Sequence, residues 1–210
     1  MKINLDESFL LNSTIKTCDL IFVAIPQNLT KDDLANAISS STGNGNENSI
    51  HVGILKKDLN DEFLVIEACP TGGVINTPLK SFIRNNLICN PLTRFYVKRI
   101  KFSNEEDIKR WINEAEKHIG KKYNFSYLPS KDSLYCSELI YITYRDKNKQ
   151  PLFKEISMNF KDKDGNFPPY WINNFKKLNM EIPQSKMGTN PNQMMNNNEL
   201  LEFICEIKNR

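Results

Sequence analysis

The sequence predicts an α+β fold in which an antiparallel sheet packs against two helices. Residues 104–119 carry apolar side chains at helical spacing. The polar stretch 56–62 is short enough to join its flanking runs as an antiparallel hairpin. Short β-rich runs bounded by turn residues recur along the chain, at residues 19–25, 51–55, 63–68, 94–100 and 201–207. At 210 residues the chain suits one domain over residues 1–210.

The amino-terminal part is expected to enter the sheet after a lead-in. Residues 1–18 have no strong pattern and are expected to be loosely held, and 19–25 form the first core strand. Thr30 and Asp33 can cap a short helix. The polar loop 39–49 follows and, because it is rich in Gly and Asn, it is expected to be a mobile rim of a binding cleft.

The middle of the chain holds the clearest helix. Residues 74–75 resume a strand, 78–83 suit one or two helical turns, and 94–100 alternate basic and apolar side chains as a half-exposed strand does. Ser103 and Glu106 are the expected capping box of the helix 104–119. His118 falls in its last turn, where the helix dipole favours a solvated cation over a catalytic role.

The carboxyl-terminal part alternates irregular and regular segments. Residues 123–129 are expected to be extended and 145–163 irregular. Two prolines open a helix at 168–172, where their missing amide hydrogens cost nothing. Residues 183–198 are expected to be a loop, and 201–207 a closing strand.

The stretch 134–140 places a cysteine where a helix is expected to begin. Asp132 or Ser133 can cap that helix, which puts Cys136 in its first turn. There the helix dipole lowers the pKa of a thiol, and unbonded backbone amides can receive an oxyanion. Cys136 is therefore a candidate nucleophile; the alternative is a small buried core residue.

Two upstream residues are candidates to activate this thiol. If the hairpin is centred on Leu59, His51 and Glu67 are direct cross-strand partners with Cβ atoms roughly 4.5 to 5.5 Å apart. A carboxylate at that distance can hold an imidazole in one tautomer. Cys136, His51 and Glu67 then form a catalytic triad. The alternatives are a structural histidine and a glutamate paired with a nearby lysine.

Composition narrows the classes of partner. The net charge of +3 comes from 28 basic and 25 acidic residues without a block of like charges, so nucleic acid is not expected as a partner. No apolar run approaches the ~20 residues of a membrane span. Acidic residues at the amino end argue against a signal peptide, which leaves the cytoplasm, or the cell envelope if a signal was removed.

The cysteines argue against metal and disulfide chemistry. There are five of them, an odd number, and none lies in a CxxC pair. Neither a zinc site nor a disulfide framework is expected, and the chemistry of a thiol hydrolase needs no cofactor.

Seven short motifs carry a family resemblance. They lie, in order, at residues 19–22, 37–43, 51–54, 65–68, 120–124, 135–139 and 188–192. In this order they resemble the YiiX/YebB-like branch of the permuted papain-like cysteine hydrolases, in the NlpC-type superfamily. Together they cover most of residues 19–192. One departure is Cys18, where that family usually has a glycine.

The resemblance implies a circularly permuted papain-like fold, in which the strands bearing the histidine and its polar partner precede the cysteine helix. It also implies that Cys136 is the nucleophile, His51 the base and Glu67 the residue that orients the base. Tyr123 matches a position facing the cleft, where it can bind substrate or the oxyanion; a core tyrosine is the alternative. Tyr135, beside the nucleophile, is a second candidate for substrate binding.

The function that follows is thiol-dependent cleavage of an amide or peptide bond through an acyl-enzyme, with cell-wall peptides among the candidate substrates. The expected cleft rim, residues 39–49 and 183–198, is polar, which favours an amidase or peptidase. A lipid acyl-ester hydrolase or acyltransferase is the alternative, and so is a catalytically silent binding module on the same fold.

Overall fold

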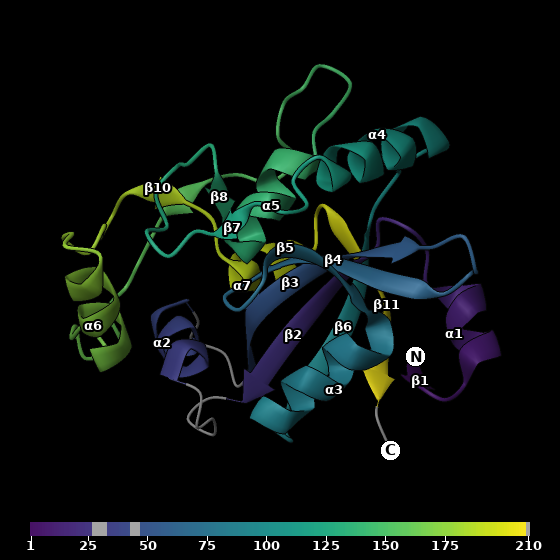
Figure 1. The fold of residues 1–210 in the computed structure, drawn as a ribbon. Helices are drawn as coiled ribbons and strands as arrows, with labels where there is room; N and C mark the ends of the chain where they lie inside the picture. The colour runs from purple at the N-terminus through teal and green to yellow at the C-terminus, as the bar shows by residue number, and fades with distance from the viewer. Residues whose placement is uncertain (27–32, 43–46, 209–210) are drawn as a thin grey trace.

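A computed structural model describes residues 1–26, 33–42 and 47–208 of the chain. Its centre is a seven-stranded sheet in the order β1-β11-β6-β2-β3-β4-β5 (Figure 1). All neighbours are antiparallel except β1 and β11, which run parallel. The strands are β1 Lys2–Asn4, β2 Leu20–Pro26, β3 Glu47–Lys57, β4 Phe63–Cys69, β5 Gly73–Pro78, β6 Arg94–Ile100 and β11 Leu201–Lys208. The α+β class predicted from sequence is confirmed.

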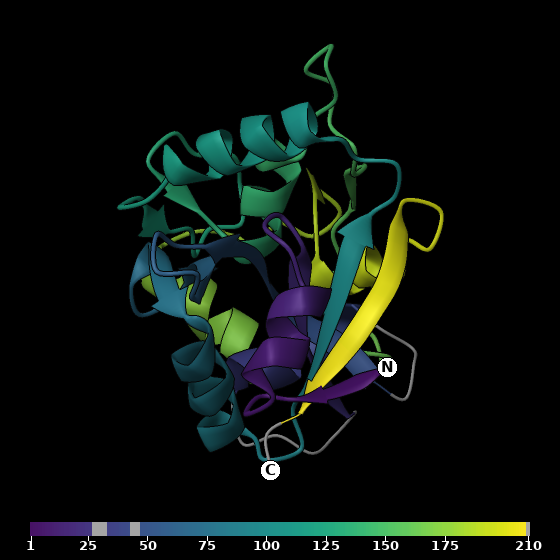
Figure 2. The ribbon, with the colours of Figure 1, turned by 90° about the vertical axis from the view of Figure 1, so that its right-hand side faces the viewer.

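Helices cover both faces of this sheet. Apolar side chains of α5 pack on one face with Phe22, Ile54 and Ile66. Those of α3 pack on the other with Val23 and Leu55. Figures 1 and 2 show α4 and α5 lying together on the first side. The helices are α1 Ser8–Thr14, α2 Asp33–Thr42, α3 Leu79–Cys89, α4 Glu105–Glu116, α5 Cys136–Thr143, α6 Pro169–Lys177 and α7 Pro191–Met195.

The amino-terminal segment is not the loosely held lead-in that was expected. Strand β1 pairs with β11, with Lys2 opposite Glu206, and α1 follows it. Ile3, Leu11 and Ile15 are buried in the core under α3. Apolar burial and main-chain pairing therefore fix the segment to the sheet. The assignment of residues 1–210 to one domain stays a prediction.

Two expected loops contain regular structure. Residues 39–42 belong to α2 and 47–49 to β3; Thr30 and residues 43–46, on which a cap and part of the mobile rim were expected, lie outside the described residues. The loop expected at 183–198 holds the short strand β10, Met187–Gly188, which pairs with β9, Ile156–Ser157, and then α7. Helix α7 is too short for a repeat of apolar residues in the sequence to reveal it. Its start is nevertheless marked by Asn190, which accepts from the Gln193 N–H at 2.7 Å, and by the proline that follows.

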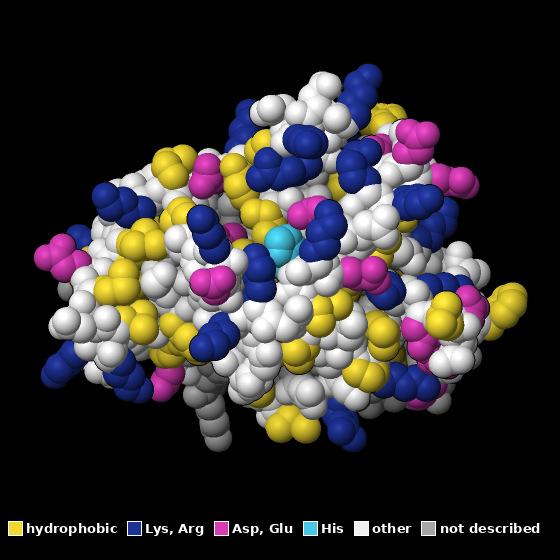
Figure 3. All heavy atoms as spheres, turned by 45° about the horizontal axis from the view of Figure 1, so that its top comes forward, with side chains coloured by type: hydrophobic (Ala, Val, Ile, Leu, Met, Phe, Trp, Pro, Cys, Tyr) yellow, Lys and Arg dark blue, Asp and Glu magenta, His cyan; other side chains and the backbone are white. Residues whose placement is uncertain are grey.

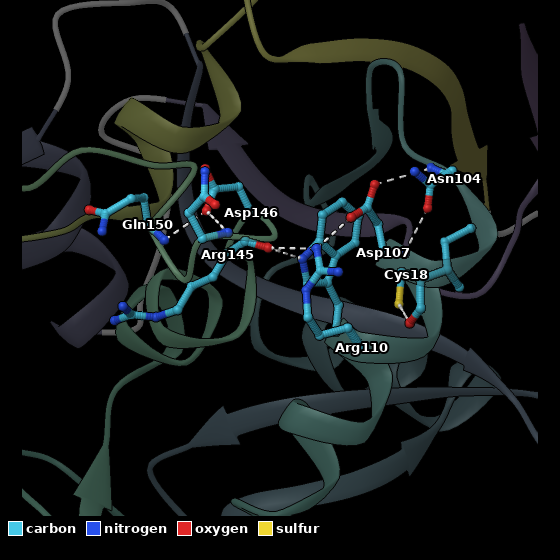
Figure 4. A network of polar contacts seen from close by, with 10 residues as sticks. Cys18, Asn104, Asp107, Arg110, Arg145, Asp146 and Gln150 are labelled. Carbon is cyan, nitrogen blue, oxygen red and sulfur yellow. Dashed lines mark hydrogen bonds and ion pairs between the residues drawn. The ribbon is translucent and has the colours of Figure 1, made fainter.

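Helix α4 begins with a different capping box from the one predicted. Asn104 Oδ1 accepts from the Asp107 N–H at 3.0 Å, and Asp107 Oδ2 accepts from the Asn104 N–H at 3.3 Å. Figure 4 shows this pair beside Arg110, which pairs with Asp107 and donates to the Arg145 carbonyl at 3.0 Å. Trp111 Nε1 donates to the same carbonyl at 2.7 Å. These bonds tie α4 to the chain that follows α5.

The surface agrees with the scattered charges of the sequence. On the face drawn in Figure 3, Lys and Arg side chains are interspersed with acidic and apolar ones. Within the described part of the chain, no helix has the length and apolar character that crossing a bilayer requires.

Candidate active site

Cys136 is the first residue of α5, and Tyr135 before it is extended, with φ −96° and ψ 168°. The predicted cap at Asp132 or Ser133 is wrong, because Ser133 lies in the short strand β8, Ser133–Leu134, which pairs with β7, Lys122–Tyr123. Instead the Tyr135 N–H donates to Glu138 Oε2 at 3.3 Å, within the first turn. The predicted placement of the thiol at a helix start is confirmed.

The hairpin that carries His51 and Glu67 has a different register from the one expected. Ile54 pairs with Ile66 and Leu55 with Val65, so the hairpin is centred on residue 60 and not on Leu59. Continuing this register sets Glu67 opposite Gly53, with His51 as its diagonal neighbour. Direct pairing of His51 with Glu67 is therefore wrong, but both stay on one face because residues 51 and 53 share it.

Gly53 keeps the space between these side chains open. A Cβ built on Gly53 would lie 2.3 Å from Val65 Cγ1 and 3.6 Å from Glu67 Cβ. The first distance is a clash with a β-branched side chain that has little freedom to move. A glycine at this position therefore lets β3 and β4 approach, and long side chains can meet diagonally across it.

The imidazole and the carboxylate are in direct contact. His51 Nε2 lies 2.6 Å from Glu67 Oε2. The other carboxylate oxygen, Oε1, accepts from Thr77 Oγ1 at 2.6 Å. The His51 ring also stacks on Phe82 of α3, with centroids 5.9 Å apart. Thr77 thus holds the carboxylate from one side, and Phe82 holds the imidazole from the other. The sequence analysis did not select Thr77.

A β-bulge lies directly before His51. Val23 of β2 pairs with His51, whereas Ala24 pairs with Ser49, which leaves Ile50 as the extra residue. The Ser49 N–H donates to Asn192 Oδ1 of α7 at 3.1 Å. Asn192 lies in the family-like motif 188–192, but its contact with β3 could not be derived from sequence spacing.

The electrostatics link all three candidate residues. Burial by itself lowers the pKa of His51, but hydrogen bonds and charge interactions with Cys136 and Glu67 raise it to about 10. Burial opposes ionisation of Glu67, yet the bonds from His51 and Thr77 leave its pKa lowered. Because Nε2 contacts Glu67, Nδ1 is the ring nitrogen left for the Cys136 thiol. The structure therefore brings together the three residues that the sequence analysis selected.

A family model matches most of the chain. The model of the family described as "Permuted papain-like amidase enzyme, YaeF/YiiX, C92 family" matches residues 14–204. This chain belongs to that family. The permuted papain-like fold and the amidase class expected from the resemblance are confirmed for this C92-family chain.

A solved structure shows the same fold. The crystal structure of the metalloprotein YiiX from Escherichia coli O157:H7 superposes with a TM-score of 0.70 at 22% sequence identity, covering 91% of the C92-family chain and 97% of YiiX. The comparison with curated proteins found no match. Within the described residues of this chain, His, Cys, Asp and Glu side chains form no group of three or more that could hold a metal ion.

The two tyrosines lie at the site in different settings. Tyr123 is buried, its hydroxyl is 3.3 Å from that of Tyr127, and its ring lines both the space beside His51 and that beside Cys136. The Tyr135 hydroxyl accepts from the Thr189 N–H at 3.1 Å, which ties the start of α5 to the segment before α7. Tyr123 thus forms part of the cleft wall. Substrate binding by either residue of the C92-family chain stays a prediction.

The site opens into two adjoining spaces. A cleft of about 490 Å³ is lined by His51 and Glu67, and a pocket of about 40 Å³ is lined by Cys136. Ile38 and Tyr123 line both. The thiol and the imidazole of this C92-family chain therefore face neighbouring spaces that share a wall.

Proposed function

We propose that this C92-family chain cleaves an amide or peptide bond through an acyl-enzyme on Cys136. The observation that carries the proposal is the partly buried imidazole of His51, which contacts Glu67 through Nε2 at 2.6 Å and interacts with Cys136 at the start of α5. A thiol, an imidazole and a carboxylate in this order are the arrangement used for nucleophilic catalysis.

The proton that the Cys136 thiol gives up is held on His51, whose pKa is raised to about 10, and the sulfur attacks the carbonyl carbon. The oxyanion forms beside the backbone N–H groups at the start of α5, and losing one such donor typically costs about 10² to 10³ in rate. His51 then protonates the leaving amine as the C–N bond breaks. Water, deprotonated by His51, attacks the thioester and releases the carboxylic acid and the free thiol.

Glu67 and Thr77 act through His51. The carboxylate fixes the tautomer that presents Nδ1 to the sulfur and stabilises the imidazolium form. Thr77 holds the carboxylate by donating to Oε1 at 2.6 Å. In this proposal Cys136 and His51 are catalytic residues, and Glu67 and Thr77 are positioning residues.

Cell-wall peptides are one candidate substrate class. The amide preference is supported by the family, whose description is that of an amidase. A lipid acyl-ester hydrolase or acyltransferase is the second candidate, because the apolar walls of the pocket beside Cys136, among them Met158, Phe160 and Trp171, suit an uncharged acyl group. Offering the purified protein cell-wall peptides and acyl esters separates the two, and exclusive turnover of the esters contradicts the amide preference.

Alkylation by iodoacetamide tests the triad before any substrate is known. Cys136 is expected to react near neutral pH much faster than the other four of the five cysteines, because His51 promotes its ionisation. Peptide mass spectrometry reads each thiol separately. His51→Ala is expected to slow Cys136 alone, and His118→Ala is the matched control. Uniformly slow labelling of all five thiols would support a silent binding module instead.

A further inference from the structure

We propose that the acyl part of the substrate is short and uncharged, and that it occupies the pocket lined by Cys136. The proposal rests on the proposed function and adds a substrate class to it. Its starting point is the division of the site into a small space beside the sulfur and a larger one beside the imidazole.

The chemistry assigns the two halves of the substrate to these spaces. His51 must reach the leaving group to protonate it, so the leaving amine lies in the cleft of about 490 Å³ that His51 lines. The acyl carbon stays bonded to Cys136 after the first step. Its substituent therefore lies in the pocket of about 40 Å³ that Cys136 lines.

The walls of this pocket select against charge. The described residues that line it include no Asp, Glu, Lys, Arg or His side chain. Tyr127, Met158, Phe160 and Trp171 are all buried. Placing a carboxylate or ammonium group beside these apolar side chains without a charged partner is costly, so we expect a charged acyl group to be disfavoured.

The size of the pocket limits the acyl chain. A cavity needs roughly 10 to 15 Å³ to hold one water molecule. The pocket, at about 40 Å³, therefore has room for a few non-hydrogen atoms. We expect an acetyl or butyryl substituent to suit this space better than an octanoyl chain does.

Packing behind the walls keeps the pocket narrow. Trp171 meets Tyr127 and Phe160 edge to face, with centroids 5.3 and 5.1 Å apart. The Trp171 Nε1 also donates to Ser41 Oγ at 3.3 Å. Met158 is the flexible wall, and it packs on Gly188, where a Cβ would lie 2.4 Å from Met158 Sδ. Truncating Met158 is therefore the simplest way to lengthen the pocket.

The test is hydrolysis of p-nitrophenyl acetate, butyrate, octanoate and hemisuccinate by the full chain. Esters report the acyl side of the site for an amidase and an esterase alike. We expect kcat/KM for acetate or butyrate to exceed that for octanoate and hemisuccinate by about tenfold or more. Met158→Ala is expected to raise octanoate turnover relative to acetate, whereas Met180→Ala, at an exposed methionine outside the pocket, leaves the ratio unchanged.

The outcomes separate the two proposals. Hydrolysis that is the same in the Cys136→Ala variant overturns the proposed function. Hydrolysis that depends on Cys136 but is as fast for octanoate or hemisuccinate as for butyrate leaves the nucleophile in place and overturns the acyl pocket. The wild-type series decides this even if Met158→Ala does not fold, which a thermal melt reveals.

Discussion

The two histidines of this chain are both sheltered from solvent, yet their surroundings change their pKa values in opposite directions. His51 has a carboxylate on one ring nitrogen and interacts with a thiol, and its pKa is raised to about 10. Among the described residues, neither ring nitrogen of His118 has a hydrogen-bond partner, and burial, then Lys121, lower its pKa against the opposing effect of Glu114. Glu114 Oε1 lies 3.4 Å from His118 Nε2, which is within ion-pair distance, but this contact lacks the geometry of a hydrogen bond.

The comparison indicates that hydrogen-bond partners on the ring raise the pKa of a partly buried imidazole, which burial alone lowers. The sequence analysis placed His118 as a solvated cation in the last turn of a helix, and this was wrong. Helix α4 ends at Glu116, and the His118 side chain is only 13% exposed. Burial without a hydrogen-bond partner disfavours the charged form.

Exchanging each histidine for alanine should give the largest contrast. His51→Ala is expected to lower kcat/KM by about 10⁴ to 10⁶, because the base and its proton are lost together. His118→Ala is expected to stay within about twofold, since the charged neighbours that affect His118 are Glu114, Lys117 and Lys121 and not the candidate triad. The measurement is hydrolysis of the best ester or amide substrate. If His51→Ala keeps its melting temperature and loses no more kcat/KM than His118→Ala, His51 is not the base.

Glu67→Gln removes the charge that distinguishes the two imidazoles. A loss of about 10³ to 10⁴ in kcat/KM is expected, as for other carboxylates that hold a catalytic histidine in its tautomer. The amide nearly preserves shape, so circular dichroism and thermal melting serve as folding controls. Activity close to wild type would show that Cys136 and His51 act without Glu67.

Glu67→Gln should also shift the alkaline limit, which is the pH at which Cys136 alkylation stops depending on His51. The pKa of His51 is raised to about 10, so the ring loses its charge as pH rises toward 10. The stability that the charged ring contributes is fully present below the ordinary pKa of histidine and is lost over the same rise. Cys136 alkylation should lose its dependence on His51 over that rise. In Glu67→Gln the pKa of His51 falls, and the limit shifts to lower pH. An unchanged limit would mean that the carboxylate does not stabilise the imidazolium.

Thr77→Val tests the outermost contact of the site. Losing the hydrogen bond to Glu67 Oε1 is expected to lower kcat/KM by about tenfold, the value of one bond to a charged acceptor. Thr77→Ser keeps the hydroxyl and should restore most of the rate. If serine and valine have equal effects, Thr77 contributes packing and not orientation. Reading the alkaline limit in both variants adds a measure that packing alone would not change.

The smallest effect is expected for the stability contributed by His118. A lowered pKa means that the unfolded chain binds a proton that the folded chain resists, so stability falls as pH drops below about 6.5. His118→Phe removes this term and should flatten the change in melting temperature between neutral and mildly acidic pH. Glu114, Lys117 and Lys121 remain as the charged neighbours in both proteins. An unchanged slope would show that folding does not lower the pKa of His118.

The strands of the sheet could be predicted from local pattern, whereas their register could not. Residues 94–100 were expected as a strand and form β6 over Arg94–Ile100. The hairpin between β3 and β4 was centred one residue too early because its turn is set by a side chain. Asp58 Oδ1 accepts from the N–H groups of Asn60 and Glu62 at 2.8 and 2.9 Å. Such Asx contacts depend on turn chemistry that length alone does not show.

The site divides in the same way. Cys136, His51 and Glu67 could be selected because each lies near the end of an apolar run or at an expected helix start, in a motif with a chemical rationale. Thr77 and Asn192 could not, because their roles depend on contacts between segments far apart in the chain. Predicting them would need the register of β5 against β4 and the docking of α7 on β3.

The way the central sheet ends bears on how the protein avoids recruiting strands from other chains. At one border lies β1, only three residues long, and at the other β5 finishes in Pro78. Near its start β5 exchanges main-chain bonds with the turn before β7, from Val74 N–H to the Lys121 carbonyl and from Gly120 N–H to the Val74 carbonyl, each 2.8 Å. Brevity, proline and a covering turn are devices that discourage edge-to-edge aggregation. The borders of this sheet are therefore poor templates for amyloid-like growth.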